Sequence, residues 1–221
     1  MKKVRLAFSV VIVCVAAAPA FAQSERGYIS GAGGFAVTPE ATSGAVMLEG
    51  GVRVAPHLLV FGDLGQYHDL QPSDVQPAID LATEQLSTTG LNTIGTGRVP
   101  ATFALGGLRY ELPTFHGFLL YALGGVGIAR LSPTATFTYS SGPLADGTTA
   151  ALGQDITSQV ESSGSFAPPP ATTVLMYSFG GGVQVPVFGP WTADVGYRFS
   201  RFNADTPVNA QGVTFGIGYG F

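Results

Sequence analysis

Cysteine is almost missing from this chain of 221 residues, because Cys14 is the only one. Cys14 lies in an apolar stretch near the N-terminus, without the small residue just before it that a lipoprotein cleavage site requires. We therefore interpret Cys14 as part of a signal peptide. Once that peptide is removed, the mature chain has no disulfide, no thiolate nucleophile and no cysteine-ligated metal.

Basic residues are scarce in the expected mature chain. Residues 23–221 contain seven arginines and no lysine against fourteen acidic residues, which gives a net charge of −7. Proteins that bind nucleic acid normally carry an excess of basic side chains for the phosphate backbone. We therefore expect no nucleic acid partner.

Long apolar runs are also absent after residue 22, although the mean hydropathy of the chain is +0.32. A helix that crosses a bilayer needs about 20 consecutive apolar residues. Apolar residues that alternate with small or polar ones are typical of membrane-spanning strands instead. The composition therefore favours an all-β chain that crosses a membrane with strands.

The N-terminus has the features of a secretory signal. A basic start precedes an apolar run at residues 6–18, and Ala20 and Ala22 form a small-x-small cleavage site. We predict that residues 1–22 are a cleaved signal for Sec-type export. Residues 23–221 would then form one domain.

The last nine residues, 213–221, alternate strictly. Every odd position is large and apolar, and every even position is Thr or Gly, which is the period of an extended strand. The apolar face ends with Tyr219 and Phe221. Such a strand suits lipid on its outer side and a crowded lumen on its inner side. The alternative is a buried edge strand of a secreted sandwich.

Eight segments of the chain alternate in this way. Tight turns join the second to the third, the fourth to the fifth and the sixth to the seventh segment. The other connections include two long loops, residues 68–99 and 140–171. A β-sandwich does not require tight turns at every second connection. A membrane barrel does show this order, because its short turns lie at one end and its longer loops at the other. The eight segments are residues 28–37, 45–55, 58–67, 101–112, 117–131, 172–187, 191–202 and 213–221.

These patterns resemble the eight-stranded bacterial outer-membrane β-barrels of the OmpA-like, OmpX-like and OmpW-like superfamily, over residues 27–221. The resemblance implies an antiparallel up-and-down transmembrane barrel with short periplasmic turns and long extracellular loops. It implies the outer membrane of a Gram-negative cell as the location. It also implies that Tyr219 and Phe221 act as the signal for the barrel-insertion machinery. We expect the chain to differ from OmpA itself in having no periplasmic peptidoglycan-binding domain.

Charged residues fall on the inward faces of at least five segments. Eight strands leave room only for side chains, and an unpaired charge there is costly, so we predict a salt-bridge ladder that plugs the lumen. A gate or narrow channel is the alternative. The pattern does not decide which face of the third and fifth segments points into the lumen. In the fifth segment we place Leu119, Tyr121 and Leu123 outward. The predicted network is Glu49, Arg53, Asp63, Arg109, Glu111, Arg130, Asp194 and Arg198.

The two long loops carry further signals. Residues 75–86 place apolar side chains on one helical face, which predicts a short helix with Ser73 as its cap. The alternation of the fifth segment resumes at Phe137 and Tyr139, which predicts a ribbon beyond the membrane. These loops contain seven acidic residues and a single basic residue, Arg98. They are a solvated surface, or they hold divalent cations against lipopolysaccharide, or they contact an extracellular ligand.

Histidine is too sparse to indicate a catalytic site. His57 and His116 fall in turns at the presumed periplasmic end. His68 lies beside Asp69 and near Ser73 at the other end, so a lipid-A-modifying enzyme is one alternative. That alternative requires His68 within hydrogen-bond reach of a serine or an acid. No metal-ligand spacing or phosphate loop stands out, and we predict no catalytic residue, cofactor or metal.

Together these observations predict a monomeric outer-membrane barrel that acts as a structural or surface-interaction protein. Its expected partners are outer-membrane lipid, lipopolysaccharide, the insertion machinery and an extracellular ligand at the loops. A narrow channel for small or hydrophobic solutes is the main alternative.

Overall fold

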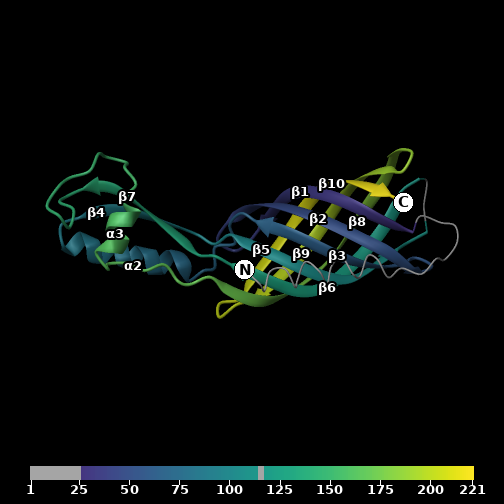
Figure 1. Ribbon diagram of the computed structural model, residues 1–221, viewed down its shortest axis with the longest axis horizontal. Coiled ribbons are helices and arrows are strands. Elements are labelled where there is room, and N and C mark those ends of the chain that lie inside the picture. Colours follow the sequence, from purple (N-terminus) through teal and green to yellow (C-terminus); the bar gives the residue numbers. More distant parts are fainter. Residues whose placement is uncertain (1–25, 114–116) are drawn as a thin grey trace, which may run out of the picture.

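The computed structural model describes residues 26–113 and 117–221. The predicted cleavage residues Ala20 and Ala22 lie outside the described residues, as does His116. Eight strands close into an antiparallel barrel in the order β1-β10-β9-β8-β6-β5-β3-β2 (Figure 1). The predicted eight-stranded all-β barrel is therefore confirmed, and the sandwich alternative is wrong. The barrel strands are β1 (Gly27–Val37), β2 (Thr42–Ala55), β3 (Leu58–Tyr67), β5 (Ala101–Glu111), β6 (Leu119–Leu131), β8 (Thr172–Phe188), β9 (Trp191–Asn203) and β10 (Val208–Gly220).

The first and last strands close the barrel by antiparallel pairing from Tyr28 and Gly220 to Val37 and Gln211. The pairing continues to the chain end, because Phe221 O accepts hydrogen bonds from the amides of Arg26 and Gly27 at 2.5 and 2.9 Å. β10 starts at Val208 rather than at residue 213, since polar outward residues interrupt its apolar face. Each barrel strand of the described chain thus has two hydrogen-bonded neighbours. This closure matters because hydrocarbon cannot form hydrogen bonds with the backbone groups of a free strand edge.

Large apolar side chains point away from the barrel, as predicted. Phe215 and Ile217 are 56% and 62% exposed, whereas Thr214, the residue before Phe215, is buried. The same alternation runs around the wall and produces an apolar outer band, which is the face expected against lipid. Its exposed residues include Ile29, Val46, Leu48, Val60, Leu64, Leu108, Val126, Ile128, Leu175, Phe179 and Val195.

The predicted faces of β6 are wrong. Tyr121 and Leu123 are buried in the lumen, each 8% exposed, and Arg130 is exposed on the outer wall. Tyr121 fits inside because Gly182 and Gly196 leave room for it. A Cβ atom at those two positions would lie 2.6 and 3.0 Å from the Tyr121 hydroxyl. Since side chains alternate along a strand, placing Tyr121 inside puts every even-numbered residue of β6 outside.

Two long connections leave the same end of the barrel and fold together, beyond the barrel along its long axis (Figure 1). The connection from β3 to β5 contains α2 (Val75–Thr88) and β4 (Asn92–Arg98). The connection from β6 to β8 contains β7 (Thr134–Ser141) and α3 (Thr157–Ser162). β4 and β7 pair in an antiparallel two-stranded sheet. We call residues 71–98 and 134–171 the lobe.

At the other end of the barrel, which we call the turn end, the connections are residues 56–57, 112–118 and 189–190. At the lobe end, residues 38–41 and 204–207 are the two short connections. The predicted sorting of short turns to one end and long loops to the other is therefore confirmed.

The helix predicted in the first loop is confirmed as α2. Its N-cap residue is Asp74 rather than Ser73, and no side-chain hydrogen bond caps the helix. Stability must instead come from the buried face of Ile79, Ala82 and Leu86. Neither helix of the described chain is long and apolar enough to cross a membrane.

Candidate functional site

Glu49 is the centre of an ion-pair network in the lumen. Arg198 Nη2 lies 2.8 Å from Glu49 Oε2, and Arg109 Nη1 lies 3.4 Å from Glu49 Oε1. Tyr28 donates its hydroxyl to Glu49 Oε1 at 2.5 Å. Arg198 also donates to Asp63 through Nη1. Glu49 and Asp63 occupy directly paired positions on β2 and β3, so Arg198 neutralises two carboxylates that would otherwise repel each other.

Arg198 reaches these carboxylates from the opposite wall. It lies on β9, which is four strands away from β3 in either direction around the barrel. The side chains of Arg198 and Asp63 are 9% and 0% exposed, so the pair is shielded from water. The ion pair therefore bridges the bore from wall to wall.

Arg109 extends the network toward the turn end. Its Nε lies 3.5 Å from Glu111 Oε1, and Glu111 Oε2 lies 2.6 Å from Arg53 Nη2. The Arg109 guanidinium also lies 3.7 Å from the centroid of the Tyr121 ring, a cation–π contact. Gln184 Oε1 accepts a further hydrogen bond from Arg109 Nη2 at 2.8 Å. The fully buried guanidinium thus has partners on several sides, as a buried charge requires.

Six of the eight residues predicted to form the lumen network are joined by ion pairs in the structure. The two exceptions are Asp194 and Arg130. Asp194 lies inside the barrel, but it accepts a hydrogen bond from the Tyr121 hydroxyl at 3.0 Å and makes no ion pair with a described residue. Arg130 points outward, because the facing of β6 is the reverse of the prediction. Tyr28 and Tyr121 were missed, since sequence alone treats large aromatic residues as lipid-facing.

Between the ion pairs and the lobe, apolar side chains fill the lumen. The Tyr67 ring lies 5.5 Å from the ring of Phe103 and 5.6 Å from that of Phe202, measured between centroids. The Tyr67 hydroxyl lies 3.1 Å from Ser200 Oγ. This apolar filling was not predicted. The other buried residues on this side of the ion pairs include Ala129, Leu131, Met176, Val208 and Ala210.

A cavity of about 230 Å³ opens at the turn end of the lumen. Arg53, Glu111 and Gln184 line it, so members of the charged network form part of its wall. Leu119, predicted to face outward, also lines this cavity. The cavity lies on the opposite side of the ion pairs from the apolar filling.

The lobe has a hydrophobic core of its own. Phe137 on β7 is fully buried and packs edge-on against Phe166, with centroids 5.1 Å apart. α2 approaches β4 closely because Gly95 and Gly97 lack side chains. A Cβ atom at Gly95 would lie 2.4 Å from Ile79 Cγ2. The buried residues of this core are Ile79, Ala82, Leu86, Leu91, Phe137, Tyr139, Ile156 and Val160.

Gln76 protects the outer edge of β4. Its Nε2 donates to Gly95 O at 3.2 Å, and its Oε1 accepts from the Gly97 amide at 3.3 Å. The side-chain amide thus takes the place of a neighbouring strand at an otherwise open edge. Capped edges resist pairing with other chains, so Gln76 makes this stretch of the β4 edge less open to another strand.

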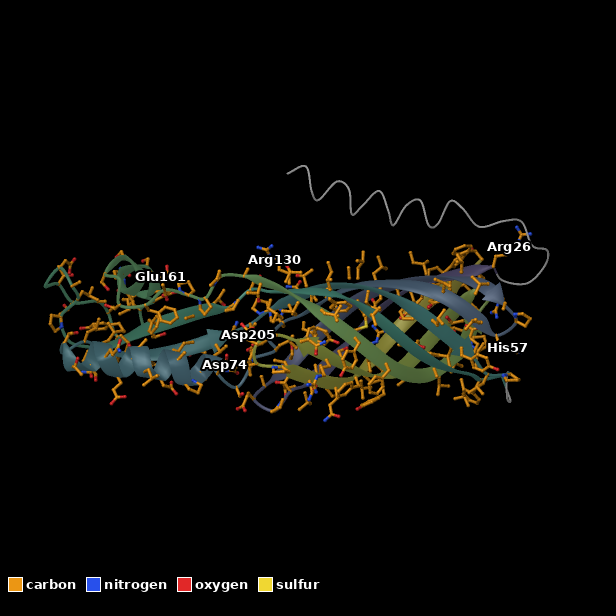
Figure 2. The ribbon with its side chains drawn as sticks, turned by 90° about the horizontal axis from the view of Figure 1, so that it is seen from below. Arg26, His57, Asp74, Arg130, Glu161 and Asp205 are labelled. Carbon is orange, nitrogen blue, oxygen red and sulfur yellow. The ribbon has the colours of Figure 1, made fainter. Side chains whose placement is uncertain are left out.

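Contacts at the junction fasten the lobe to the barrel. Asp69 Oδ1 accepts hydrogen bonds from the amides of Gln71 and Val99 at 3.1 and 2.9 Å. Thr206 in the β9–β10 connection donates to Asp74 Oδ2 at 3.0 Å. Figure 2 shows Asp74 at this junction, with Asp205 of the same connection nearby. Val75 packs against both the barrel cluster and the lobe core, so the two cores are continuous.

Acidic residues dominate the surface of the lobe and its junction. Hydrogen bonds from the Thr148 and Thr157 hydroxyls lower the pKa values of Asp146 and Asp155, which therefore stay ionised at neutral pH. Among the described residues, no group of three or more His, Cys, Asp or Glu could hold a metal ion. The acidic residues are Asp69, Asp74, Asp80, Glu84, Asp146, Asp155 and Glu161.

His68 does not meet the condition set for the enzyme alternative. Its ring makes no hydrogen bond or ion pair with any residue that the structure describes, whereas the Asp69 carboxylate accepts from backbone amides. Ser43 lies nearby, but its hydroxyl accepts from the Asp69 amide at 2.8 Å. His57 lies in an exposed turn at the opposite end of the barrel.

A family profile described as the outer membrane protein beta-barrel domain matches residues 8–221. The comparison with curated proteins gave no match. Among solved structures, the chain is similar to neisserial surface protein A, with 14% identity, 88% of this chain and 96% of that chain covered, and a TM-score of 0.52.

It is also similar to a major outer membrane protein from Thermus thermophilus, with 10% identity, 88% and 99% coverage and a TM-score of 0.51. Ail, the attachment invasion locus protein of Yersinia pestis, matches with 14% identity, 89% and 97% coverage and a TM-score of 0.45. At identities this low, the first two likenesses show a shared fold.

Proposed function

Since the chain belongs to the outer membrane β-barrel domain family, we propose that it is a non-enzymatic scaffold that presents a folded lobe at the cell surface. The observation that carries this proposal is the lobe itself: it has a closed hydrophobic core and is fastened to the barrel by backbone and side-chain bonds. A rigid support that displays a distinct surface is the usual design of a binding protein.

The proposal includes the partners of the scaffold. Outer-membrane lipid would surround the apolar band of the barrel. The insertion machinery would recognise the terminal strand with Tyr219 and Phe221, which both point outward. An extracellular ligand would contact the lobe, whose acidic surface favours a basic partner. The chain would act as a monomer, because its barrel is closed by its own strands.

An epitope inserted after Gly147 in the lobe is expected to bind antibody on intact cells. The same epitope after Gly189, at the turn end, should bind only after the outer membrane is permeabilised. The two positions are matched, because both are turn glycines with positive φ and open space around them. Labelling of intact cells through Gly189 rather than Gly147 would reverse the proposed orientation. A soluble periplasmic protein without heat-modifiable gel mobility would end the proposal.

The purified barrel is expected to show no stable openings in a planar lipid bilayer. Ion pairs bridge the bore, and apolar side chains fill it toward the lobe, so no continuous water path is expected. A general porin added to the same bilayer afterwards serves as the positive control. Discrete, reproducible openings before that addition would contradict the plug and favour the narrow-channel alternative.

A further inference from the structure

The outward wall of the barrel carries charge at two positions. Among outward-facing residues of the eight described barrel strands, Arg130 on β6 and Arg201 on β9 are the charged ones. Every other outward residue is apolar, small or neutral and polar. Both charged residues are arginines, in a chain with seven arginines and fourteen acids after residue 22.

Both arginines lie near the lobe end of their strands, on the two strands that flank β8. Arg130 is eleven residues beyond Leu119, the first residue of β6, and Arg201 is ten residues beyond Trp191, the first of β9. Arg130 is paired with Thr173 of β8 and Arg201 with Tyr177, so the two positions lie four residues apart along β8, about 13 Å. β8 lies between them and is hydrogen-bonded to both strands.

Both positions are at the lobe-side boundary of the apolar band. Ile128 precedes Arg130 on the same face and is 56% exposed, and beyond it the outward residues turn polar. Thr102 and Thr173 are the paired neighbours of Arg130, and Asn209 is paired with Arg201. Figure 2 shows Arg130 at the lobe end of the barrel, pointing away from it. Both arginines therefore lie where the outer leaflet's head groups begin.

Neither Arg130 nor Arg201 has an ion-pair partner among the described residues. In the part of the chain that the structure describes, no carboxylate lies within ion-pair distance of Arg130 or Arg201, whereas Arg53, Arg109 and Arg198 all have such partners. No acid lies among the outward residues of the described barrel strands; the acids Asp74 and Asp205 lie nearby, at the junction with the lobe. A guanidinium presents a planar set of donors that fits phosphate oxygens with two parallel hydrogen bonds.

The opposite boundary of the band is different. There the outward wall ends in aromatic residues, including Tyr110, Trp191 and Tyr219, and carries no charge among the described strand residues. Aromatic rings suit the interface of any lipid and select no anionic group. The asymmetry assigns the charged contacts to the leaflet on the lobe side alone.

We propose that Arg130 and Arg201 form a binding site for the phosphate groups of lipopolysaccharide in the outer leaflet. The inference rests on the proposed function, because it needs the lobe to be extracellular. The β6–β8–β9 wall would hold the acyl chains of the lipid below the site, and the two guanidinium groups would bind phosphates above. The site would orient the barrel and fix the lobe's height above the membrane.

The test compares R130Q/R201Q with the unchanged protein, each purified in detergent micelles and titrated with lipopolysaccharide by calorimetry. The variant is expected to bind about tenfold more weakly, since charge-assisted hydrogen bonds are the strong ones. The unchanged protein should lose a similar factor with enzymatically dephosphorylated lipopolysaccharide. R98Q is the control for loss of a positive charge outside the site, because Arg98 lies on the lobe; it removes one charge, and the double variant removes two.

Equal binding of lipopolysaccharide by R130Q/R201Q and the unchanged protein would overturn this site. Equal binding of intact and dephosphorylated lipopolysaccharide would overturn it too, as would equally strong binding of phosphatidylglycerol. A tenfold loss in R98Q would show a nonspecific charge effect and would also overturn it. Heat-modifiable mobility of each variant reports folding separately. A wild-type protein found outside the outer membrane would defeat the proposed function instead of this site alone.

Discussion

Replacement of Arg198 with leucine is expected to destabilise the barrel by about 3–5 kcal/mol, the usual cost of leaving a buried charge without its partner. Arg198 is the group that neutralises Asp63, and it shares Glu49 with Arg109. Without it, two carboxylates at paired positions of β2 and β3 would repel each other in a space closed to water. Urea unfolding in lipid vesicles, followed by heat-modifiable gel mobility, measures the change.

The double variant R198L/D63L separates loss of pairing from loss of packing. Removing both partners is expected to recover most of the stability, because Glu49 keeps Arg109 and no uncompensated charge remains. R130L is the control for removing one arginine, since its side chain is exposed on the outer wall. An R198L barrel that unfolds at the same urea concentration as the unchanged protein would show that the network does not hold the barrel together.

Truncation of Phe137 to alanine is expected to destabilise the lobe by about 3–5 kcal/mol while leaving the barrel folded. Phe137 is fully buried between α2 and the segment containing Phe166, so its removal leaves a cavity at the centre of a small core. A core of this size has little stability to spare. Hydrogen exchange of the protein in lipid vesicles should show faster exchange across α2, β4 and β7.

I94A provides the matched control for the lobe. Ile94 lies on the paired strand β4 but is 63% exposed, so its truncation should change exchange rates little. Barrel amides should be protected equally in both variants. Faster exchange in the barrel strands of F137A would show that lobe and barrel unfold as one unit. Unchanged exchange in the lobe would show that Phe137 does not hold its core.

The outward faces were largely predictable, because alternation is a local property. Leu48 and Glu49, or Leu108 and Arg109, are neighbours in sequence, and one of each pair must face lipid. The prediction failed on β6, where a tyrosine and an arginine compete for the lumen. There the pattern puts the larger apolar residue outside, while Gly182 and Gly196 on other strands make room for Tyr121 inside.

The lobe was predictable only in parts. The apolar face of α2 has a helical period, and the alternation at Phe137 and Tyr139 indicates a strand. β4 was missed, because Gly95 and Gly97 read as loop residues in sequence. Glycine is required at both positions because α2, from the same loop, lies directly against β4 and leaves no room for a side chain. Nothing in either loop alone shows that β4 and β7, from two different loops, pair with each other.

By itself, the order of residues determined that strands of period two form here, that their bulky faces point toward lipid, and that long loops gather at one end. Each of these follows from interactions between close neighbours in the chain. Tertiary structure alone decided that Arg198 meets Asp63 across the bore, that Tyr121 displaces Arg130 from the lumen, and that two loops share one core. Those contacts depend on ring closure and on the volume that opposite walls leave, which no single segment encodes.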